Sequence, residues 1–179
     1  IRALSKICRV KLEETQLDYI ASKTGSDVFF FMHCDEDGTG CALVSGRGEV
    51  IKKITPRRDL YLVLVFPEIF SSTKEAYELV DKQLASGTQN DFVILESLEE
   101  EYRKDPSQWR FINTFTPSLC GVYGELKSAL GTLKKIGADY CNMSGSGSTL
   151  YGVFTSKQRA ISVMNLLATT WNCTLVSLL

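Results

Sequence analysis

Apolar residues in the first part of the chain recur at helical spacing and then gather in a short run. Ile1, Leu4 and Ile7 lie on one face of a helix, so we expect the chain to open within a helix. A second helix follows, with Thr15 as its predicted cap and Gly25 at its end. The apolar run at 28–32 fits either a strand or a buried turn, because periodicity cannot assign so short a segment.

A hairpin and a boundary are predicted next. Two strands are expected at 41–45 and 50–54, and the Gly-Arg-Gly-Glu sequence at 46–49 suits a turn that needs positive φ. The Pro-Arg-Arg-Asp sequence at 56–59 is a plausible boundary between domains.

Beyond this boundary the pattern alternates between strands and helices. The segment 60–66 is apolar throughout, as expected of a strand covered on both faces. Thr73 is expected to cap a helix that runs to about Leu84. The other predicted elements are helices at 91–103, 119–136 and 157–168, and strands at 140–143, 149–154 and 173–176. This order favours an α/β fold in which one sheet is backed by helices.

Net charge, apolar runs and cysteine spacing argue against several classes of function. The formal net charge is -1 with acids and bases mixed along the chain, which argues against a nucleic-acid partner. No apolar run approaches the ~18 residues that a membrane span needs, so no membrane partner is expected. Six cysteines without CxxC spacing indicate reduced thiols, and we expect a cytoplasmic protein.

The sequence Met-Ser-Gly-Ser-Gly-Ser-Thr at 143–149 is the most informative local feature. Glycines let backbone N–H groups approach a ligand closely, and successive amides in such a turn bind anions. Serine hydroxyls add donors for phosphate oxygens. The alternative is a flexible hairpin turn between two strands, since a short Gly-Ser stretch is a weak motif.

Two further segments are candidates for chemistry. Asp27 follows Gly25-Ser26 and precedes an apolar run, so its carboxylate could act as a general base or simply belong to a turn or cap. The Ser-Thr-Lys-Glu-Ala-Tyr sequence at 72–77 opens a helix whose free amides could meet an anion. Tyr77 could then stack on an aromatic base; alternatively, Thr73 is only a cap and Tyr77 a core residue.

Residue types that often bind metals are clustered at 33–38 (His-Cys-Asp-Glu-Asp-Gly), but their spacing matches neither an EF-hand nor a zinc site. An EF-hand would need a glutamate six residues after Gly38, where Val44 stands. A zinc site would need further Cys or His ligands nearby. We therefore interpret this stretch as a polar loop and predict no metal site from it, and the single histidine gives little support for His-based catalysis.

The order of these motifs is more specific than any one of them. Gly-Ser-Asp-Val-x-Phe-Phe at 25–31, Gly-Arg-Gly-Glu, Ser-Thr-Lys-Glu-Ala-Tyr, Asn90-Asp91 and the 143–149 segment occur in one series. This series resembles the GHMP superfamily of small-molecule kinases and, within it, the 4-diphosphocytidyl-2-C-methyl-D-erythritol kinases. The resemblance runs over nearly the whole chain, and the 143–149 segment matches the third conserved motif of the superfamily.

The resemblance implies an ATP-dependent phosphorylation of the 2-hydroxyl of a CDP-linked methylerythritol, in non-mevalonate isoprenoid biosynthesis. Asp27 matches the catalytic aspartate of the family. Thr73 matches a threonine that contacts cytidine, and Tyr77 an aromatic residue that stacks on the base. This substrate is the expected small-molecule partner.

The resemblance also implies a phosphate loop, cofactors and a domain organisation. Gly145, Ser146 and Gly147 match the glycine-rich loop near the phosphates, and the implied cofactors are ATP and Mg²⁺. The implied fold is the GHMP kinase fold. Residues 1–57 would be the C-terminal part of the N-terminal domain, and 58–179 the complete C-terminal α/β sandwich.

The chain departs from the family in several places. The main glycine-rich ATP loop and an N-terminal lysine are absent, Phe29 stands where the family usually has proline, and the loop at 33–38 is longer. We therefore expect an incomplete portion of an enzyme that is inactive alone, with the missing N-terminal segment as its partner. Alternatives are another GHMP kinase, of the homoserine or phosphomevalonate type, or a non-catalytic α/β module that binds a nucleotide or a protein.

Overall fold

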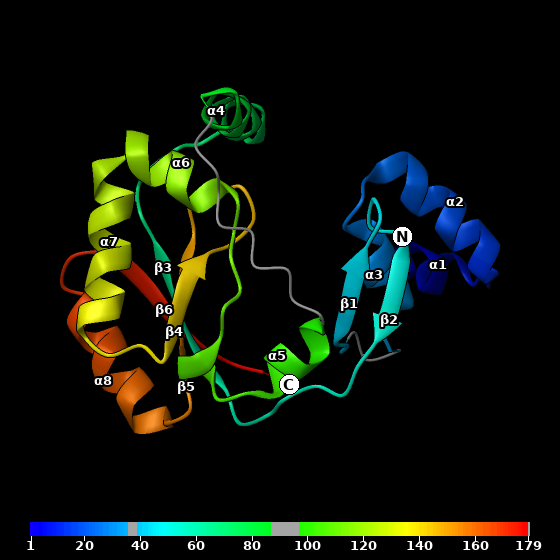
Figure 1. Ribbon diagram of the computed structural model, residues 1–179. Helices are drawn as coiled ribbons and strands as arrows, with labels where there is room; N and C mark the ends of the chain where they lie inside the picture. Colours follow the sequence, from blue (N-terminus) through cyan, green and yellow to red (C-terminus); the bar gives the residue numbers. More distant parts are fainter. Residues whose placement is uncertain (36–38, 87–96, 179) are drawn as a thin grey trace. The chain divides into compact units, whose positions relative to one another are not determined.

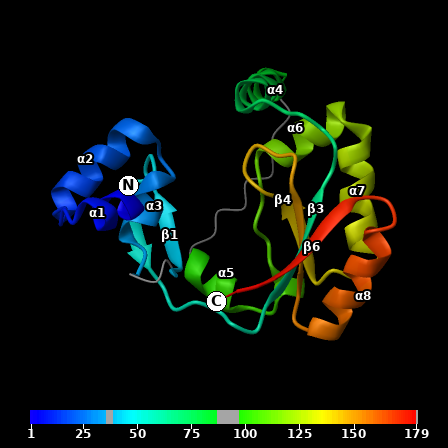
Figure 2. The same ribbon diagram turned by 180° about the vertical axis from the view of Figure 1, so that it is seen from behind.

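The computed structural model of the protein describes residues 1–35, 39–86 and 97–178 (Figures 1 and 2). Contacts within the chain divide it into two compact units, Ile1–Pro56 and Arg57–Leu178. The Asn90-Asp91 motif, the first part of the helix predicted at 91–103, and residues 36–38 of the predicted polar loop lie outside the described residues.

In the residues described, the first unit contains three helices and a hairpin. They are α1 (Arg2–Cys8), α2 (Glu14–Thr24), α3 (Val28–His33), β1 (Ala42–Ser45) and β2 (Val50–Lys53). The predicted hairpin is confirmed, because β1 and β2 pair antiparallel. The Thr15 cap is wrong: α2 begins with a capping box in which the Gln16 side chain accepts from the Glu13 amide at 3.0 Å.

The apolar run at 28–32 belongs to a helix, α3, rather than to a strand. Gly25 ends α2 as predicted, and the Val28 amide donates to the Gly25 carbonyl at 3.1 Å. A single turn therefore separates α2 from α3. Asp27 therefore stands at the N-cap position of α3.

The second unit is an antiparallel sheet with helices on one face. Its strands are β3 (Tyr61–Phe66), β4 (Tyr140–Met143), β5 (Leu150–Phe154) and β6 (Asn172–Ser177), in the order β4-β5-β3-β6. Its helices are α4 (Thr73–Ala85), α5 (Leu98–Arg103), α6 (Phe115–Val122), α7 (Gly124–Lys135) and α8 (Lys157–Leu167). Figure 1 shows α7 and α8 on the same side of the sheet, and the view from behind agrees. The prediction of one sheet backed by helices is confirmed.

The core lies between the sheet and helices α7 and α8. Val63 and Val65 of β3 are fully buried, together with Leu133 of α7 and Ala160 of α8. The residues between and beside them in β3 are only half-buried. The expectation that both faces of this strand are covered is therefore wrong, since an antiparallel strand with helices on one face alternates in burial.

Two helix predictions need correction. Ser72, and not Thr73, caps α4: its Oγ accepts from the Glu75 amide at 3.1 Å, and Thr73 is the first helical residue. The helix predicted at 119–136 is two helices that meet at Tyr123, where the backbone is extended. Gly121 and Gly124 flank this break, and glycine is a poor helix former.

A buried carboxylate ties α5 to the segment that follows it. The Glu101 side chain is 1% exposed and accepts from the Arg110 amide at 2.7 Å and from Lys104 Nζ at 2.7 Å. Hydrogen bonds from Arg110 and Lys104 lower the pKa of Glu101 to about 2, against 4.5 for an ordinary glutamate. Burial of an ion is tolerated here because several donors satisfy it.

In the described ranges, every helix is too short or too polar to cross a membrane. The six cysteines are present as thiols, with Cys8 exposed and Cys141 buried. Burial raises the pKa of the Cys120, Cys141 and Cys173 thiols.

Candidate functional site

The glycine-rich segment forms the turn between β4 and β5. The Ser144 amide donates to the Thr149 carbonyl at 2.9 Å, and the Gly147 amide donates to the Ser144 carbonyl at 3.0 Å. Gly145 has φ 54°, which places positive φ at the first central position of the turn. Gly147 has φ 86°, which strains residues other than glycine, and a Cβ there would lie 2.8 Å from the Met143 sulfur, so that a larger residue would have to displace this side chain.

This turn is bonded to other parts of the second unit. Ser146 Oγ lies 2.9 Å from Thr73 Oγ1, in the first turn of α4. Ser148 Oγ donates to the Ile69 carbonyl at 2.7 Å, before that helix. An unrestrained hairpin turn would not show such bonds, so the 143–149 segment is held in a defined shape.

Several backbone N–H groups near this turn do not donate a hydrogen bond within the described residues. Among the described residues, the amides of Gly145 and Ser146 have no hydrogen-bond acceptor. The same holds for the amides of Thr73 and Lys74 at the start of α4, as is usual for the first turn of a helix. The contact between Thr73 and Ser146 makes these two groups of free amides neighbours, and free amides favour an anion.

Tyr77 follows Thr73 by about one turn of α4 and is not a core residue. Its side chain is 57% exposed. Its ring meets the ring of Phe115 edge to face, with centroids 5.0 Å apart and planes at 90°. Such a contact fixes the ring while leaving much of it open.

Asp27 belongs to the first unit, and its carboxylate is exposed. It stands at the N-cap of α3 but makes no side-chain cap hydrogen bond. Among the described residues it has no ion-pair or hydrogen-bond partner. The interpretation of Asp27 as a structural cap therefore has no support in the geometry.

The hairpin turn of the first unit packs directly against the segment before Asp27. Gly48 has φ 110°, and a Cβ at this position would lie 2.3 Å from the Ser26 carbonyl oxygen. Only glycine fits this approach. A cavity of about 590 Å³ opens beside it, lined by Ser22, Gly25, Ser26, Phe29, Arg47 and Glu49.

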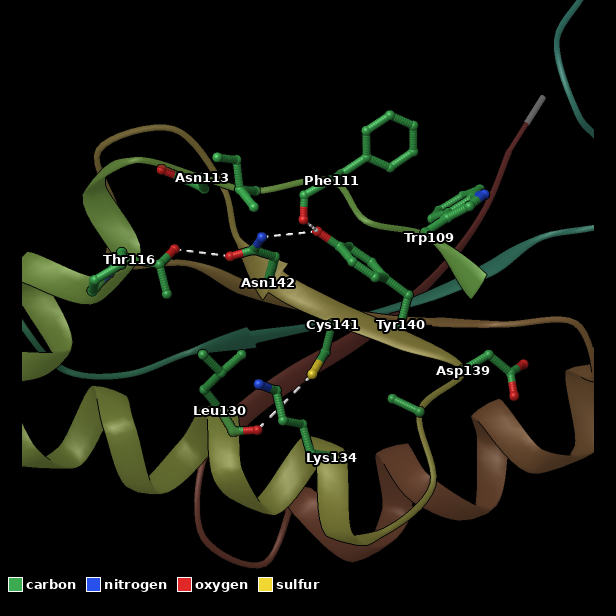
Figure 3. A pocket seen from close by; sticks show the side chains of 13 residues that line it. Trp109, Phe111, Asn113, Thr116, Leu130, Lys134, Asp139, Tyr140, Cys141 and Asn142 are labelled. Carbon is green, nitrogen blue, oxygen red and sulfur yellow. Dashed lines mark hydrogen bonds between the residues drawn. The ribbon is translucent and has the colours of Figure 1, made fainter. Parts of the chain in front are cut away.

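A second pocket, of about 440 Å³, lies along the outer edge of β4 (Figure 3). Its polar groups bond to one another. Tyr140 donates its hydroxyl to the Phe111 carbonyl at 2.7 Å, and Asn142 Nδ2 donates to that hydroxyl at 2.8 Å. Thr116 Oγ1 donates to Asn142 Oδ1 at 2.8 Å, and Figure 3 shows these two side chains facing each other. The network fastens the segment 111–116 to the sheet edge, and burial raises the pKa of Tyr140.

No cluster of three or more His, Cys, Asp or Glu side chains that could hold a metal ion occurs in residues 1–35, 39–86 and 97–178. The one histidine, His33, has its Nε2 2.8 Å from Asp18 Oδ1. Residues 36–38 of the ligand-rich stretch lie outside the described part of the chain.

Sequence reasoning missed one residue of this site, Asn113. Its Nδ2 donates to the Met143 and Gly145 carbonyls, each at 2.8 Å. Its Oδ1 accepts from the Phe115 amide at 2.9 Å, near the start of α6. An asparagine before a helix is a recognisable cap signal, but its two carbonyl partners lie 30 and 32 positions away and leave no local pattern.

Comparison with known protein families finds a match within the second unit. Residues 94–172 match the family model described as GHMP kinases C terminal. Over these residues the chain is similar to the C-terminal domain of GHMP kinases. The GHMP resemblance and the fold class predicted from the motifs are thereby confirmed.

The chain is also similar to curated kinases over most of its length. It is 30% identical over 158 residues to a 4-diphosphocytidyl-2-C-methyl-D-erythritol kinase of Treponema pallidum, covering 85% of this chain and 53% of that protein. It is 28% identical over 174 residues to the kinase of the same name from Thermodesulfovibrio yellowstonii, covering 96% and 59%. The chain thus spans slightly more than half the length of these curated relatives.

Solved structures agree on the GHMP fold. A crystal structure of 4-(cytidine 5'-diphospho)-2C-methyl-D-erythritol kinase superposes with a TM-score of 0.72 at 23% identity, covering 97% of this chain and 59% of that one. Homoserine kinase from Cytophaga hutchinsonii superposes with a TM-score of 0.61 at 16% identity, covering 97% and 60%. At these identities the likeness concerns the fold alone.

Proposed function

We propose that this chain is part of an ATP-dependent kinase that phosphorylates the 2-hydroxyl of 4-diphosphocytidyl-2-C-methyl-D-erythritol. The observation that carries the proposal is the bond between Thr73 and Ser146, which joins the start of α4 to the glycine-rich turn. Sequence similarity to kinases of this name supports the choice of substrate.

The turn and the helix start fit a phosphate group. The free amides of Gly145 and Ser146 would donate to phosphate oxygens, and the turn is held in shape before any ligand arrives. Preorganised donors stabilise charge without being rearranged at the moment of reaction. ATP supplies the phosphoryl group when bound, and Mg²⁺ is the expected counter-ion, which needs few protein ligands.

Substrate binding is assigned to α4. Tyr77 would stack on the cytosine ring, because its ring is exposed and braced by Phe115. Thr73 would contact the cytidine through its hydroxyl. An aromatic platform suits a substrate that carries a nucleobase better than it suits homoserine.

Asp27 would accept the proton of the attacking hydroxyl. Its carboxylate has no partner among the described residues, so it is free to act as a base. In phosphoryl transfer most of the barrier is lowered by positioning and charge neutralisation, so one base and a set of phosphate-binding donors suffice. We assign residues 1–57 to the end of the N-terminal GHMP domain and 58–179 to the C-terminal domain.

The test is an assay of the full-length gene product. ADP formation is measured with the CDP-linked methylerythritol and, in parallel, with homoserine and phosphomevalonate. We expect turnover with the first compound only. Turnover with another alcohol would replace the substrate assignment, and binding of nucleotide without any turnover would favour the non-catalytic module.

A further inference from the structure

We propose that Asn113 is a positioning residue, which turns the peptide groups of the glycine-rich loop so that the Ser146 amide faces a phosphate group. The inference rests on the proposed function for the identity of the phosphate ligand. Asn113 itself lies outside the loop and outside every motif that the sequence presents.

The orientation of the Asn113 amide follows from its neighbours. The carbonyl oxygens of Met143 and Gly145 can only accept, so they face Nδ2, at 2.8 Å each. The Phe115 amide can only donate, so it faces Oδ1. Three of the four hydrogen bonds open to an asparagine side chain are therefore made, and both N–H groups are directed at the loop.

The bond to Gly145 decides where the next amide points. In a planar trans peptide the C=O and N–H groups point to opposite sides. Holding the Gly145 carbonyl toward Asn113 therefore turns the Ser146 N–H away from it. The neighbouring bond behaves in the same way, since the Met143 carbonyl faces Asn113 and the Ser144 amide points instead to the Thr149 carbonyl.

Asn113 can hold the loop because its own segment is fixed. On one side the Phe111 carbonyl accepts from the Tyr140 hydroxyl, and on the other Thr116 donates to Asn142 (Figure 3). Asn142 is 9% exposed, and its Oδ1 also accepts from the Met143 amide at 2.9 Å. One hydrogen-bond network thus connects β4, the 111–116 segment and the glycine-rich loop. Within this network, Asn113 makes the contact with the loop.

The first experiment measures hydrogen exchange in the full-length gene product. Asn113→Asp keeps the acceptor for the Phe115 amide but replaces the donor by an oxygen that repels both carbonyls. We expect the Ser144 and Gly147 amides to exchange at least tenfold faster. Asn165→Asp, the same change at an exposed position of α8, is the control and should leave them unchanged. Exchange within twofold of wild type in the Asn113 variant would overturn the proposal.

The second experiment titrates the same proteins with pyrophosphate and follows the ¹⁵N–¹H signal of Ser146. This signal should shift in the wild type and in Asn165→Asp, and the apparent affinity should fall at least fivefold in Asn113→Asp. Equal shifts and affinities in all three proteins would overturn the role of Asn113. If Asn113→Asp folds poorly, Asn113→Ser is used, whose hydroxyl cannot reach both carbonyls.

Kinetics separate this inference from the proposed function. In an active enzyme, Asn113→Asp should raise the KM for ATP at least fivefold and leave the KM for the alcohol substrate within twofold. Equal increases would indicate a general packing role and contradict the inference. If the wild type transfers phosphate to none of the alcohols, the proposed function fails, while exchange and the pyrophosphate titration still decide the role of Asn113.

Discussion

Thr73 and Ser146 lie 73 positions apart in the sequence, yet their side-chain oxygens are 2.9 Å apart. The first stands at the beginning of α4 and the second in the turn between β4 and β5. One hydrogen bond therefore joins the segment proposed to bind cytidine to the segment proposed to bind phosphate. Mutations of these two side chains are therefore expected to have non-additive effects.

Thr73→Val removes this hydroxyl while keeping the shape of the side chain. We expect substrate binding to weaken by about 0.5–1.5 kcal/mol, the net value of one hydrogen bond. Calorimetric titration of the full-length gene product measures the change, and Thr73→Ser is the matched control. In a double-mutant cycle with Ser146→Ala, strictly additive losses would show that the two side chains act independently.

Asp27→Asn tests the proposed base. The exposed side chain caps nothing, so the variant should fold and melt like the wild type. Turnover should fall by about 10²–10⁴, the usual contribution of a general base. The rate of ADP formation at saturating substrate gives the answer, and a variant within threefold of wild type would remove Asp27 from the mechanism.

Tyr77→Ala tests the proposed stacking platform. Loss of a base–aromatic stack should weaken binding of the cytidine substrate by about 1–3 kcal/mol, with little change in the affinity for ATP. Tyr77→Phe keeps the ring and its contact with Phe115, and should bind substrate nearly normally. Equal losses for substrate and ATP would instead point to a packing role for this ring.

Glu101→Gln tests the buried carboxylate of α5. The pKa of Glu101 is about 2 in the folded protein, below its ordinary value of 4.5, so the folded state favours the ionised form. Its contribution to stability is present above pH 4.5 and is lost as the pH falls toward 2. The melting temperature of the variant should therefore lie furthest below that of the wild type near pH 7, and the gap should narrow on acidification. A gap independent of pH would contradict this role.

Local signals in the sequence were sufficient to predict the hairpin and the end of α2. The glycines at 46 and 48 supply positive φ for a turn, and Gly25 ends a helix whatever lies around it. Cap positions were harder to predict. Ser72 and Thr73 are both good cap residues, and only the folded backbone shows that Ser72 is the cap.

Other features depend on partners far away in the chain. Whether the 28–32 run becomes helix or strand is decided by packing, since its composition suits both. The Asn113 side chain donates to carbonyls 30 and 32 positions away, and the Thr73 hydroxyl bonds to the Ser146 hydroxyl, 73 positions away. No periodicity or spacing encodes such contacts, so the motif residues could be predicted while the bonds that hold them could not.

The order β4-β5-β3-β6 also bears on how the protein is made. β3 is the first strand of its sheet to be synthesised, yet it lies between β5 and β6, and Tyr61 pairs with Ser177. Translation proceeds at roughly 5–20 residues per second, so many seconds separate the emergence of β3 from that of its last neighbour. During that interval an apolar strand with two open edges is exposed on the ribosome, a surface prone to wrong pairing. The second unit should therefore depend on nascent-chain chaperones and complete its sheet only after β6 has emerged.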